Sequence, residues 1–259
     1  MTSARARRLS AAGGVGLVVS LVVAGCMPAP ATEQARATAD LWTEFLVAAA
    51  LVGGLVWVLI TVSIVRFRRR PSQLDTLPPQ TADAPRLEIA WTIGPILVVA
   101  ILFVLTLGAL GRIDARTPSR VTVDITAFRW QWQFGYEGTG VVVAGGPDEI
   151  AEMVVPAGEP IHLVLTSADV AHSFYVPQFL FKRDAIPGRT NEFDLTIPEP
   201  GAYGGQCAEF CGVYHDRMEL RVVAVARPAF DAWLAARAAG SPSGSPSGSR
   251  AAPSGSTAP

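Results

Sequence analysis

Residues 45–65 read FLVAAALVGGLVWVLITVSIV, an apolar run without one charged side chain. A helix of this length spans the hydrocarbon core of a bilayer, so a membrane segment is expected over residues 41–65, capped by Asp40. The run is followed directly by Arg66, Arg68, Arg69 and Arg70, whereas only Arg36 lies close to its other end. Since arginine is enriched in cytoplasmic loops, residues 66–88 are expected to form a cytoplasmic loop.

A second uncharged run, residues 89–111, is expected to return the chain across the membrane. Pro78 and Pro79 break any helix in the loop between the two runs. The second run is followed by Arg112, Arg116 and Arg120, which oppose the positive-inside rule. The first helix is taken to decide the orientation. We therefore expect a two-helix transmembrane hairpin with both ends of the chain outside.

The N-terminus has the pattern of a secretory signal, because an arginine-rich start precedes an apolar stretch that begins at Ala11. The small residues directly before Cys26 are typical of a bacterial lipoprotein cleavage site. We therefore expect the signal peptide 1–25 to be removed, Cys26 to be lipidated, and residues 26–40 to form an extracytoplasmic lead. The alternative is an uncleaved anchor helix with an incidental cysteine.

From residue 121 the hydrophobic residues alternate with period two, as in VTVDIT at 121–126 and IHLVLT at 161–166. Short alternating segments between Gly/Pro clusters are typical of a β-sandwich or barrel. This all-β domain is expected over residues 115–227, followed by a short helix over 228–239. Residues 240–259 are rich in Ser, Gly and Pro and are expected to form a disordered tail.

Half of the residues are hydrophobic, which agrees with membrane segments. The net charge is only −1, but residues 121–226 hold six Lys/Arg against fourteen Asp/Glu. This acidic surface either keeps the domain soluble or steers a cationic partner towards it. No nucleic-acid partner is expected.

One loop between two expected strands, residues 207–218, reads CAEFCGVYHDRM. It brings together Cys207, Cys211, His215 and Met218, and His172 is the candidate for a further imidazole. Thiolate and thioether are soft ligands that select copper, and the set exceeds what one tetrahedral ion needs. The surplus suggests two metal ions that share bridging thiolates. The alternatives are a disulfide of exported cysteines and a structural Cys2His2 zinc site, but neither explains Met218.

Over residues 40–235 the chain resembles subunit II of the haem-copper cytochrome c oxidases. The resemblance rests on four stretches, WQWQFGY at 130–136, DVAHSF at 169–174, KRDAIPGR at 182–189 and GQCAEFCG at 205–212. It implies a cupredoxin-like fold for the β domain and a binuclear copper A centre with two copper ions. The implied copper ligands are His172, Cys207, the Glu209 carbonyl, Cys211, His215 and Met218.

The resemblance also implies a function, that of the electron-entry subunit of a proton-pumping terminal oxidase in the bacterial plasma membrane. Electrons from a separate cytochrome c, or from a membrane-bound cytochrome c donor, are implied to enter at Trp130. They pass to haem in the catalytic subunit I, where oxygen is reduced to water, and subunit III is a further implied partner. All haems belong to the partner. The alternative for Trp130 is membership of a buried aromatic strand.

The resemblance also implies functions for two carboxylates. The Glu209 side chain is implied to bind magnesium at the boundary with subunit I, for which carboxylate is a suitable ligand. Glu88 is implied to lie at the cytoplasmic mouth of a proton pathway, although an interfacial charge without a task is the alternative. His162 has apolar strand neighbours and is expected to be a structural or surface histidine.

Overall fold

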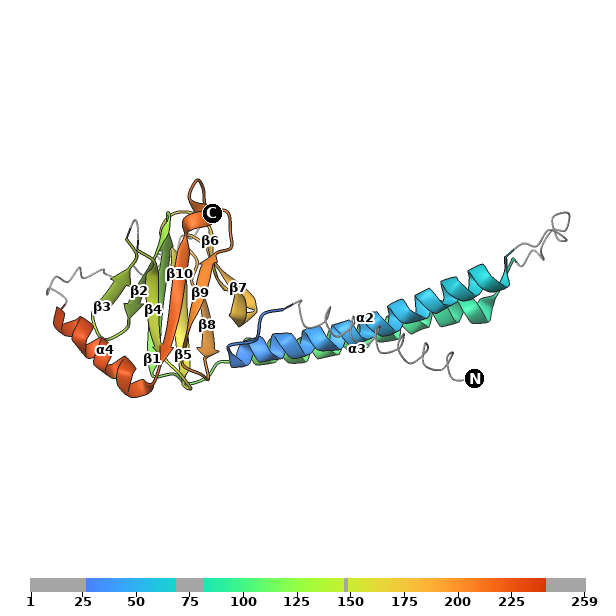
Figure 1. Ribbon diagram of the computed structural model, residues 1–259, viewed down its shortest axis with the longest axis horizontal. Helices are drawn as coiled ribbons and strands as arrows, with labels where there is room; N and C mark the ends of the chain where they lie inside the picture. Colours follow the sequence, from blue (N-terminus) through green and yellow to red (C-terminus); the bar gives the residue numbers. More distant parts are fainter. Residues whose placement is uncertain (1–26, 69–81, 147–148, 241–259) are drawn as a thin grey trace, which may run out of the picture.

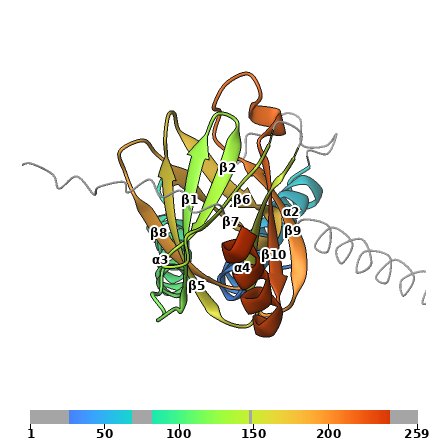
Figure 2. The ribbon, with the colours of Figure 1, turned by 90° about the vertical axis from the view of Figure 1, so that its left-hand side faces the viewer.

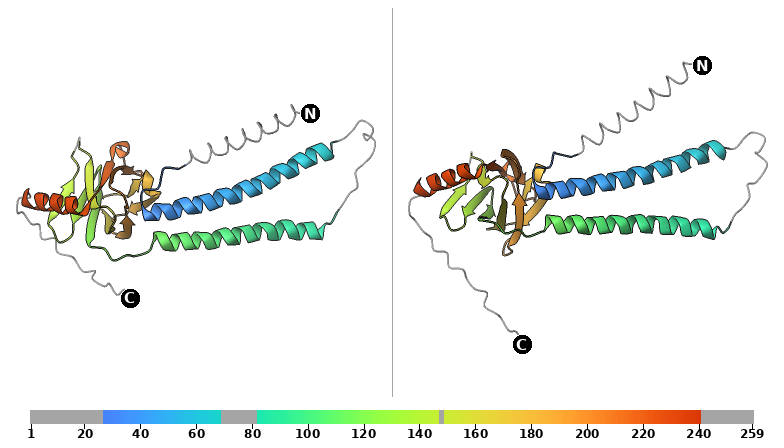
Figure 3. Two further views of the ribbon diagram at one scale, coloured as in Figure 1. Left: turned by 60° about the horizontal axis from the view of Figure 1, so that its bottom comes forward. Right: turned by 90° about the horizontal axis from the view of Figure 1, so that it is seen from below.

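The computed structural model describes residues 27–68, 82–146 and 149–240, which form a pair of long helices and a β-sandwich (Figure 1). The predictions for the signal peptide 1–25, for Cys26 and for the tail beyond residue 240 lie outside the described residues. The observed element order confirms the expected fold class, two apolar helices followed by an all-β domain. Figure 3 shows the two helices side by side, extending from one end of the sandwich.

Helix α2 runs from Glu33 to Arg66, and helix α3 from Pro85 to Ile113. Both are long and apolar enough to cross a membrane, and most of their large apolar side chains are exposed. The expected start of the first helix at residue 41 was wrong because Thr32, not Asp40, is the N-cap. The Thr32 Oγ1 accepts a hydrogen bond from the Ala35 amide at 2.9 Å, which satisfies a free donor of the first turn.

The sandwich consists of two five-stranded sheets. The first has the strand order β3-β2-β1-β5-β8 and the second the order β4-β10-β9-β6-β7. The first sheet comprises β1 (Val121–Phe128), β2 (Gln131–Tyr136), β3 (Val141–Ala144), β5 (Pro160–Ser167) and β8 (Asn191–Thr196). The second comprises β4 (Ala151–Pro156), β6 (His172–Val176), β7 (Phe181–Ala185), β9 (Gly201–Cys207) and β10 (Glu219–Val225).

The core between the sheets follows from the alternation seen in the sequence. Every second residue of β1, from Val121 to Ala127, is buried, and Trp132, Phe134 and Tyr136 of β2 are buried in the same way. Successive side chains of a strand point to opposite faces, so this pattern turns one face of each sheet inward. The two sheets thus form a frame with a buried core, and the loops connect the ends of its strands.

Helix α4 (Arg227–Gly240) lies along one side of this frame, beside the edge strands β3 and β4 of the two sheets, as Figure 2 shows. Its Phe230 is buried, and the Trp233 ring meets the Tyr136 ring edge-on with centroids 5.1 Å apart. The Tyr136 hydroxyl donates a hydrogen bond to the Val154 carbonyl at 2.8 Å. Helix α4 thus packs against the first sheet through Tyr136 and also contacts β4 of the second sheet, whereas the β9–β10 loop lies at the top of Figure 1.

Candidate metal centre

The candidate ligands meet because β6 and β9 are neighbours in the second sheet. Cys207 is the last residue of β9 and pairs with Phe174, two residues after His172 at the start of β6. The Cys207 amide donates to the Met218 carbonyl at 2.9 Å and closes the loop at its base. The Ala208 amide donates to the Ser173 carbonyl at 3.0 Å. The loop is therefore anchored on both neighbouring strands.

The two thiols lie at the centre of the cluster. Their sulfur atoms are 3.9 Å apart, too far for a disulfide bond, and both cysteines are free and buried. The ligand atoms of His172, Cys207 and Cys211 all lie within 4.8 Å of one another. A disulfide between the loop cysteines therefore does not account for their burial in this structure.

The other donors divide between the two sulfurs. The His172 Nδ1 lies 3.8 Å from the Cys207 sulfur, and the Glu209 carbonyl oxygen lies 3.2 Å from it. On the other side, the His215 Nδ1 lies 3.5 Å and the fully buried Met218 sulfur 3.7 Å from the Cys211 sulfur. The six groups expected from the sequence are thus brought together, three on each side.

The electrostatics of the site keep the two thiols from ionising together. Burial raises the pKa of a thiol, but hydrogen bonds, first with His172, lower the pKa of Cys207 to about 7. Burial and the charge on Cys207 raise the pKa of Cys211 to about 12. Two adjacent thiolates therefore require positive charge between them, and a soft cation that binds both sulfurs supplies it.

Sequence reasoning missed the function of Asp169. Its Oδ1 lies 2.8 Å from the His172 Nε2, so the carboxylate holds the ring nitrogen that faces away from Cys207. Asp169 also accepts hydrogen bonds from the Arg129 amide at 2.8 Å and the Val170 amide at 2.6 Å, and its pKa is well below the usual range. Carboxylates often orient metal-bound imidazoles. The position of Asp169, three residues before the candidate ligand His172, is therefore the sequence feature from which this contact could have been predicted.

Trp130 lies directly on the 207–218 loop that carries the candidate ligands. Its indole N–H donates to the Cys211 carbonyl at 3.3 Å, and the Tyr214 ring meets it edge-on at a centroid distance of 4.9 Å. Gly212 has a φ of +121°, and a Cβ atom there would approach the indole ring to 3.4 Å. The positive φ favours glycine at 212, whereas the ring by itself would leave a Cβ atom in ordinary van der Waals contact. Unlike buried Trp132, Trp130 is only partly buried.

The two carboxylates named from the resemblance lie in different parts of the fold. The Glu209 carboxylate is half-exposed and accepts a hydrogen bond from Lys182 Nζ at 3.1 Å, and Lys182 also pairs with Asp184 at 3.2 Å. Glu88 lies in the first turn of α3 and not in the loop before it. Its carboxylate accepts a hydrogen bond from the Ala84 amide at 3.2 Å, which caps the helix.

His162 belongs to a separate ionic cluster where β5 meets β8. Its Nδ1 lies 2.6 Å from the buried Asp194 Oδ1, and Arg116 Nη1 lies 3.5 Å from the same oxygen. Within the described residues, this histidine is not among the groups that surround the two thiols. Its position agrees with the structural function expected from the sequence.

The donor set fits copper better than zinc. A structural zinc site is filled by four sulfur or nitrogen ligands, whereas here a thioether and a backbone carbonyl also face the thiols. Thioether is a ligand of copper, and two shared sulfurs provide enough donors for two ions. The residues present therefore fit a copper site.

Comparison with known proteins gives one consistent result. Residues 148–225 match the family "Cytochrome C oxidase subunit II, periplasmic domain", and residues 20–108 match "Cytochrome C oxidase subunit II, transmembrane domain". The chain is 33% identical to "Probable cytochrome c oxidase subunit 2" of Streptomyces avermitilis, over 85% of this chain and 83% of the relative. It is 31% identical to "Cytochrome c oxidase subunit 2" of Corynebacterium glutamicum, over 89% of this chain and 85% of the relative.

Among solved structures, the chain is similar to the periplasmic domain of subunit II of cytochrome oxidase from Bradyrhizobium japonicum. The sequence identity is 31%, the match covers 47% of this chain and 95% of that chain, and the TM-score is 0.44.

Proposed function

Because the chain belongs to the cytochrome c oxidase subunit II family, we propose that it is the electron-entry subunit of its oxidase. We propose further that His172 and the 207–218 loop hold two copper ions as a copper A centre. The observation that carries the proposal is the pair of buried thiols 3.9 Å apart, with a separate histidine beside each sulfur.

Each ligand residue has a definite task. Cys207 and Cys211 would bridge the two ions, and His172 and His215 would each bind one of them. The Glu209 carbonyl would be a weak ligand on the Cys207 side, and Met218 on the Cys211 side. Copper bound there supplies a one-electron redox couple, suited to accepting an electron from cytochrome c and releasing it to haem.

Residues of this chain hold the 207–218 loop in place and connect the candidate site with the protein surface. The loop is closed by the hydrogen bond between Cys207 and Met218 and fixed to β6 by that between Ala208 and Ser173. Ligands that move little when the charge of the site changes favour rapid electron transfer. Trp130 provides the access, since its partly exposed ring is hydrogen-bonded to the Cys211 carbonyl and offers a π-system between the surface and the site.

The proposal also covers how the chain is placed in the membrane and what it binds there. The chain is a membrane-anchored subunit with two apolar helices, and we propose that α2 and α3 cross the plasma membrane with the sandwich outside. Subunit I, subunit III and a cytochrome c donor are its proposed partners. Cys26 is proposed to carry a lipid, Glu88 to face a proton pathway, and the Glu209 carboxylate to share a magnesium ion with subunit I.

A copper titration of the outer domain, residues 115–240, tests the proposal. This segment contains both sheets, their core and α4. Adding copper should give a purple protein with two copper ions per chain, and Cys207→Ser should lose both. The control Met153→Leu changes a buried core residue outside the loop and should keep both ions. A colourless wild-type domain with one zinc ion would overturn the proposal.

A further inference from the structure

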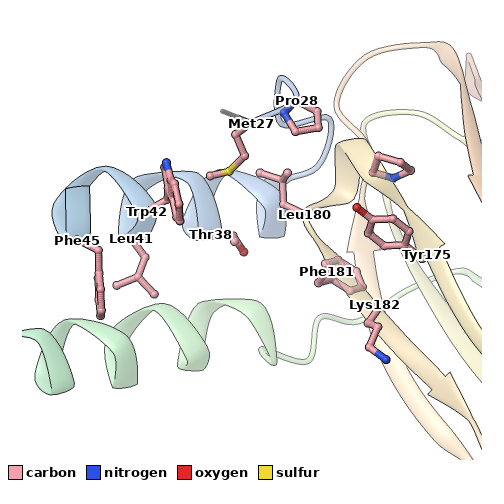
Figure 4. Close-up of a pocket in the computed structure, with 11 residues that line it drawn as sticks. Met27, Pro28, Thr38, Leu41, Trp42, Phe45, Tyr175, Leu180, Phe181 and Lys182 are labelled. Atoms are coloured by element: carbon pink, nitrogen blue, oxygen red, sulfur yellow. The ribbon is translucent and has the colours of Figure 1, made fainter. Parts of the chain in front are cut away.

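A groove of about 600 Å³ lies between α2 and the corner where β6 turns into β7 (Figure 4). Its lining is mainly apolar and aromatic, and it begins at Met27. Figure 4 shows Met27 and Trp42 on the same side of α2, with Leu180 between them and the sandwich. The groove therefore connects the start of the described chain with the flank of a membrane helix.

Backbone hydrogen bonds from both sides build this groove. The Ala31 amide donates to the Gln178 carbonyl at 2.9 Å, which ties the lead before α2 to the 3₁₀ turn η2 (Pro177–Phe179). Leu180 follows with a φ of +56°, a conformation that branched residues rarely adopt, and its amide donates to the Pro177 carbonyl at 3.2 Å. This turn directs an apolar side chain towards the groove instead of into the core.

The groove offers no unpaired charge among its lining residues. Lys182 is the one charged residue of the lining, and its ammonium group is already paired with Glu209 at 3.1 Å and Asp184 at 3.2 Å. A phospholipid with an anionic headgroup would thus find no free cation in the lining. The site is suited to a neutral hydrocarbon chain.

The direction of the groove indicates the source of a hydrocarbon chain that could occupy it. Trp42 and Phe45 lie at the outer start of the uncharged part of α2, and both rings are partly exposed along the groove. Aromatic residues are enriched at this level of a membrane, between headgroups and acyl chains. At the other end, Met27 directly follows Cys26, so the proposed lipid would be attached one residue from the groove wall.

We propose that an acyl chain of the lipid on Cys26 occupies this groove and passes along Trp42 into the outer leaflet. The inference rests on the proposed lipidation of Cys26. In that modification the thiol displaces the headgroup of a phospholipid, forming a thioether to diacylglycerol while the headgroup leaves with the thiol proton. Hydrolysis of the peptide bond before Cys26 then makes it the first residue. An acyl chain bound in the groove would hold the residues before α2 against both α2 and η2.

Photo-crosslinking in the purified oxidase with the full chain tests the proposal. Trp42, which is 47% exposed, is replaced by p-benzoylphenylalanine, and the same replacement at Trp57, which is 70% exposed on the same helix, is the matched control. Trypsin separates the lipopeptide 26–36 from peptide 37–66, which contains both probes. We expect illumination to join the two peptides several-fold more efficiently from position 42 than from position 57.

The other outcomes separate the two parts of the proposal. If mass spectrometry finds peptide 26–36 without a lipid, or still joined to residues before Cys26, the proposed processing fails and the groove assignment fails with it. If the peptide carries its lipid but position 42 captures only free phospholipid or a partner subunit, the processing stands and the assignment is wrong. Equal capture of the lipopeptide from positions 42 and 57, or no capture from position 42, also contradicts a seated chain.

Discussion

The indole N–H of Trp130 donates a hydrogen bond to the backbone carbonyl of Cys211 at 3.3 Å. This single bond connects a partly exposed ring with a residue whose sulfur belongs to the candidate metal centre. The Tyr214 ring meets the Trp130 ring edge-on, and Gly212 lies next to it. The surface and the buried thiols are therefore joined by direct contact.

Replacing Trp130 by phenylalanine should slow electron entry without removing copper. The shorter ring has no N–H donor, so it loses the hydrogen bond to Cys211, while none of the candidate ligands changes. We expect stopped-flow reduction of the oxidase by cytochrome c to be slowed by at least tenfold, with an unchanged copper spectrum. Trp233→Phe, in α4, is the control and should react at the wild-type rate. Wild-type reduction in Trp130→Phe would exclude this ring from the route.

Asp169→Asn should weaken copper binding by a change outside the ligand set. An amide cannot give the His172 ring the same charged partner, and loss of such a partner typically costs 10–100-fold in metal affinity. Chelator competition on the outer domain measures this affinity. Asp231→Asn removes an exposed carboxylate from α4 and should have no effect. An unchanged copper affinity in Asp169→Asn would show that the carboxylate does not support the imidazole.

Met218→Leu should retain copper but change its redox potential. Leucine fills nearly the same volume as methionine, so the fully buried position should keep its packing, at a cost below about 1.5 kcal/mol. The thioether next to Cys211 is lost, and the potential of the site should shift. Redox titration followed by the copper spectrum measures this shift, and Met153→Leu is the buried control. Loss of both copper ions would contradict the assignment of Met218 as a weak ligand.

The parts of this structure that follow from local patterns could be predicted from the sequence. The uncharged runs predicted two helices, and the period-two alternation around Val121 predicted strands with one buried face. The spacing from Cys207 to Met218 predicted a compact cluster of donors, and the structure brings their atoms together. Each of these predictions depends on residues that are neighbours in the chain.

The features that could not be predicted depend on contacts between distant segments. The start of α2 at Glu33 depends on Thr32 and on burial of Ala35, and both lie in a segment without a long apolar run. The groove at Leu180 requires the lead before α2 to pair with η2, far along the chain. The hydrogen bond from Trp130 to Cys211 spans 81 residues, so no local spacing could reveal it.

The buried carboxylate of Asp194 should make the stability of the outer domain depend on pH. It lies 2.6 Å from His162, accepts a hydrogen bond from the Thr117 amide at 2.7 Å and pairs with Arg116. Burial alone would raise its pKa, but these partners, His162 foremost, lower the pKa below its ordinary value. A lowered pKa means that folding favours the ionised form. The stabilisation is therefore complete above about pH 4, the ordinary value for aspartate, and is lost as the pH falls through the lowered pKa.

Asp194→Asn removes this ionised group while keeping the size of the side chain. At pH 7 we expect the variant domain to be less stable by about 1–3 kcal/mol, the usual cost of a buried polar partner left unsatisfied. The difference should shrink as the pH falls through the lowered pKa of Asp194, where the wild-type carboxyl also becomes protonated. Reversible thermal unfolding of the copper-free outer domain measures both values, with Asp231→Asn as the exposed control. A difference between wild type and Asp194→Asn that stays constant from pH 7 to pH 2 would show that the Asp194 charge does not stabilise the fold.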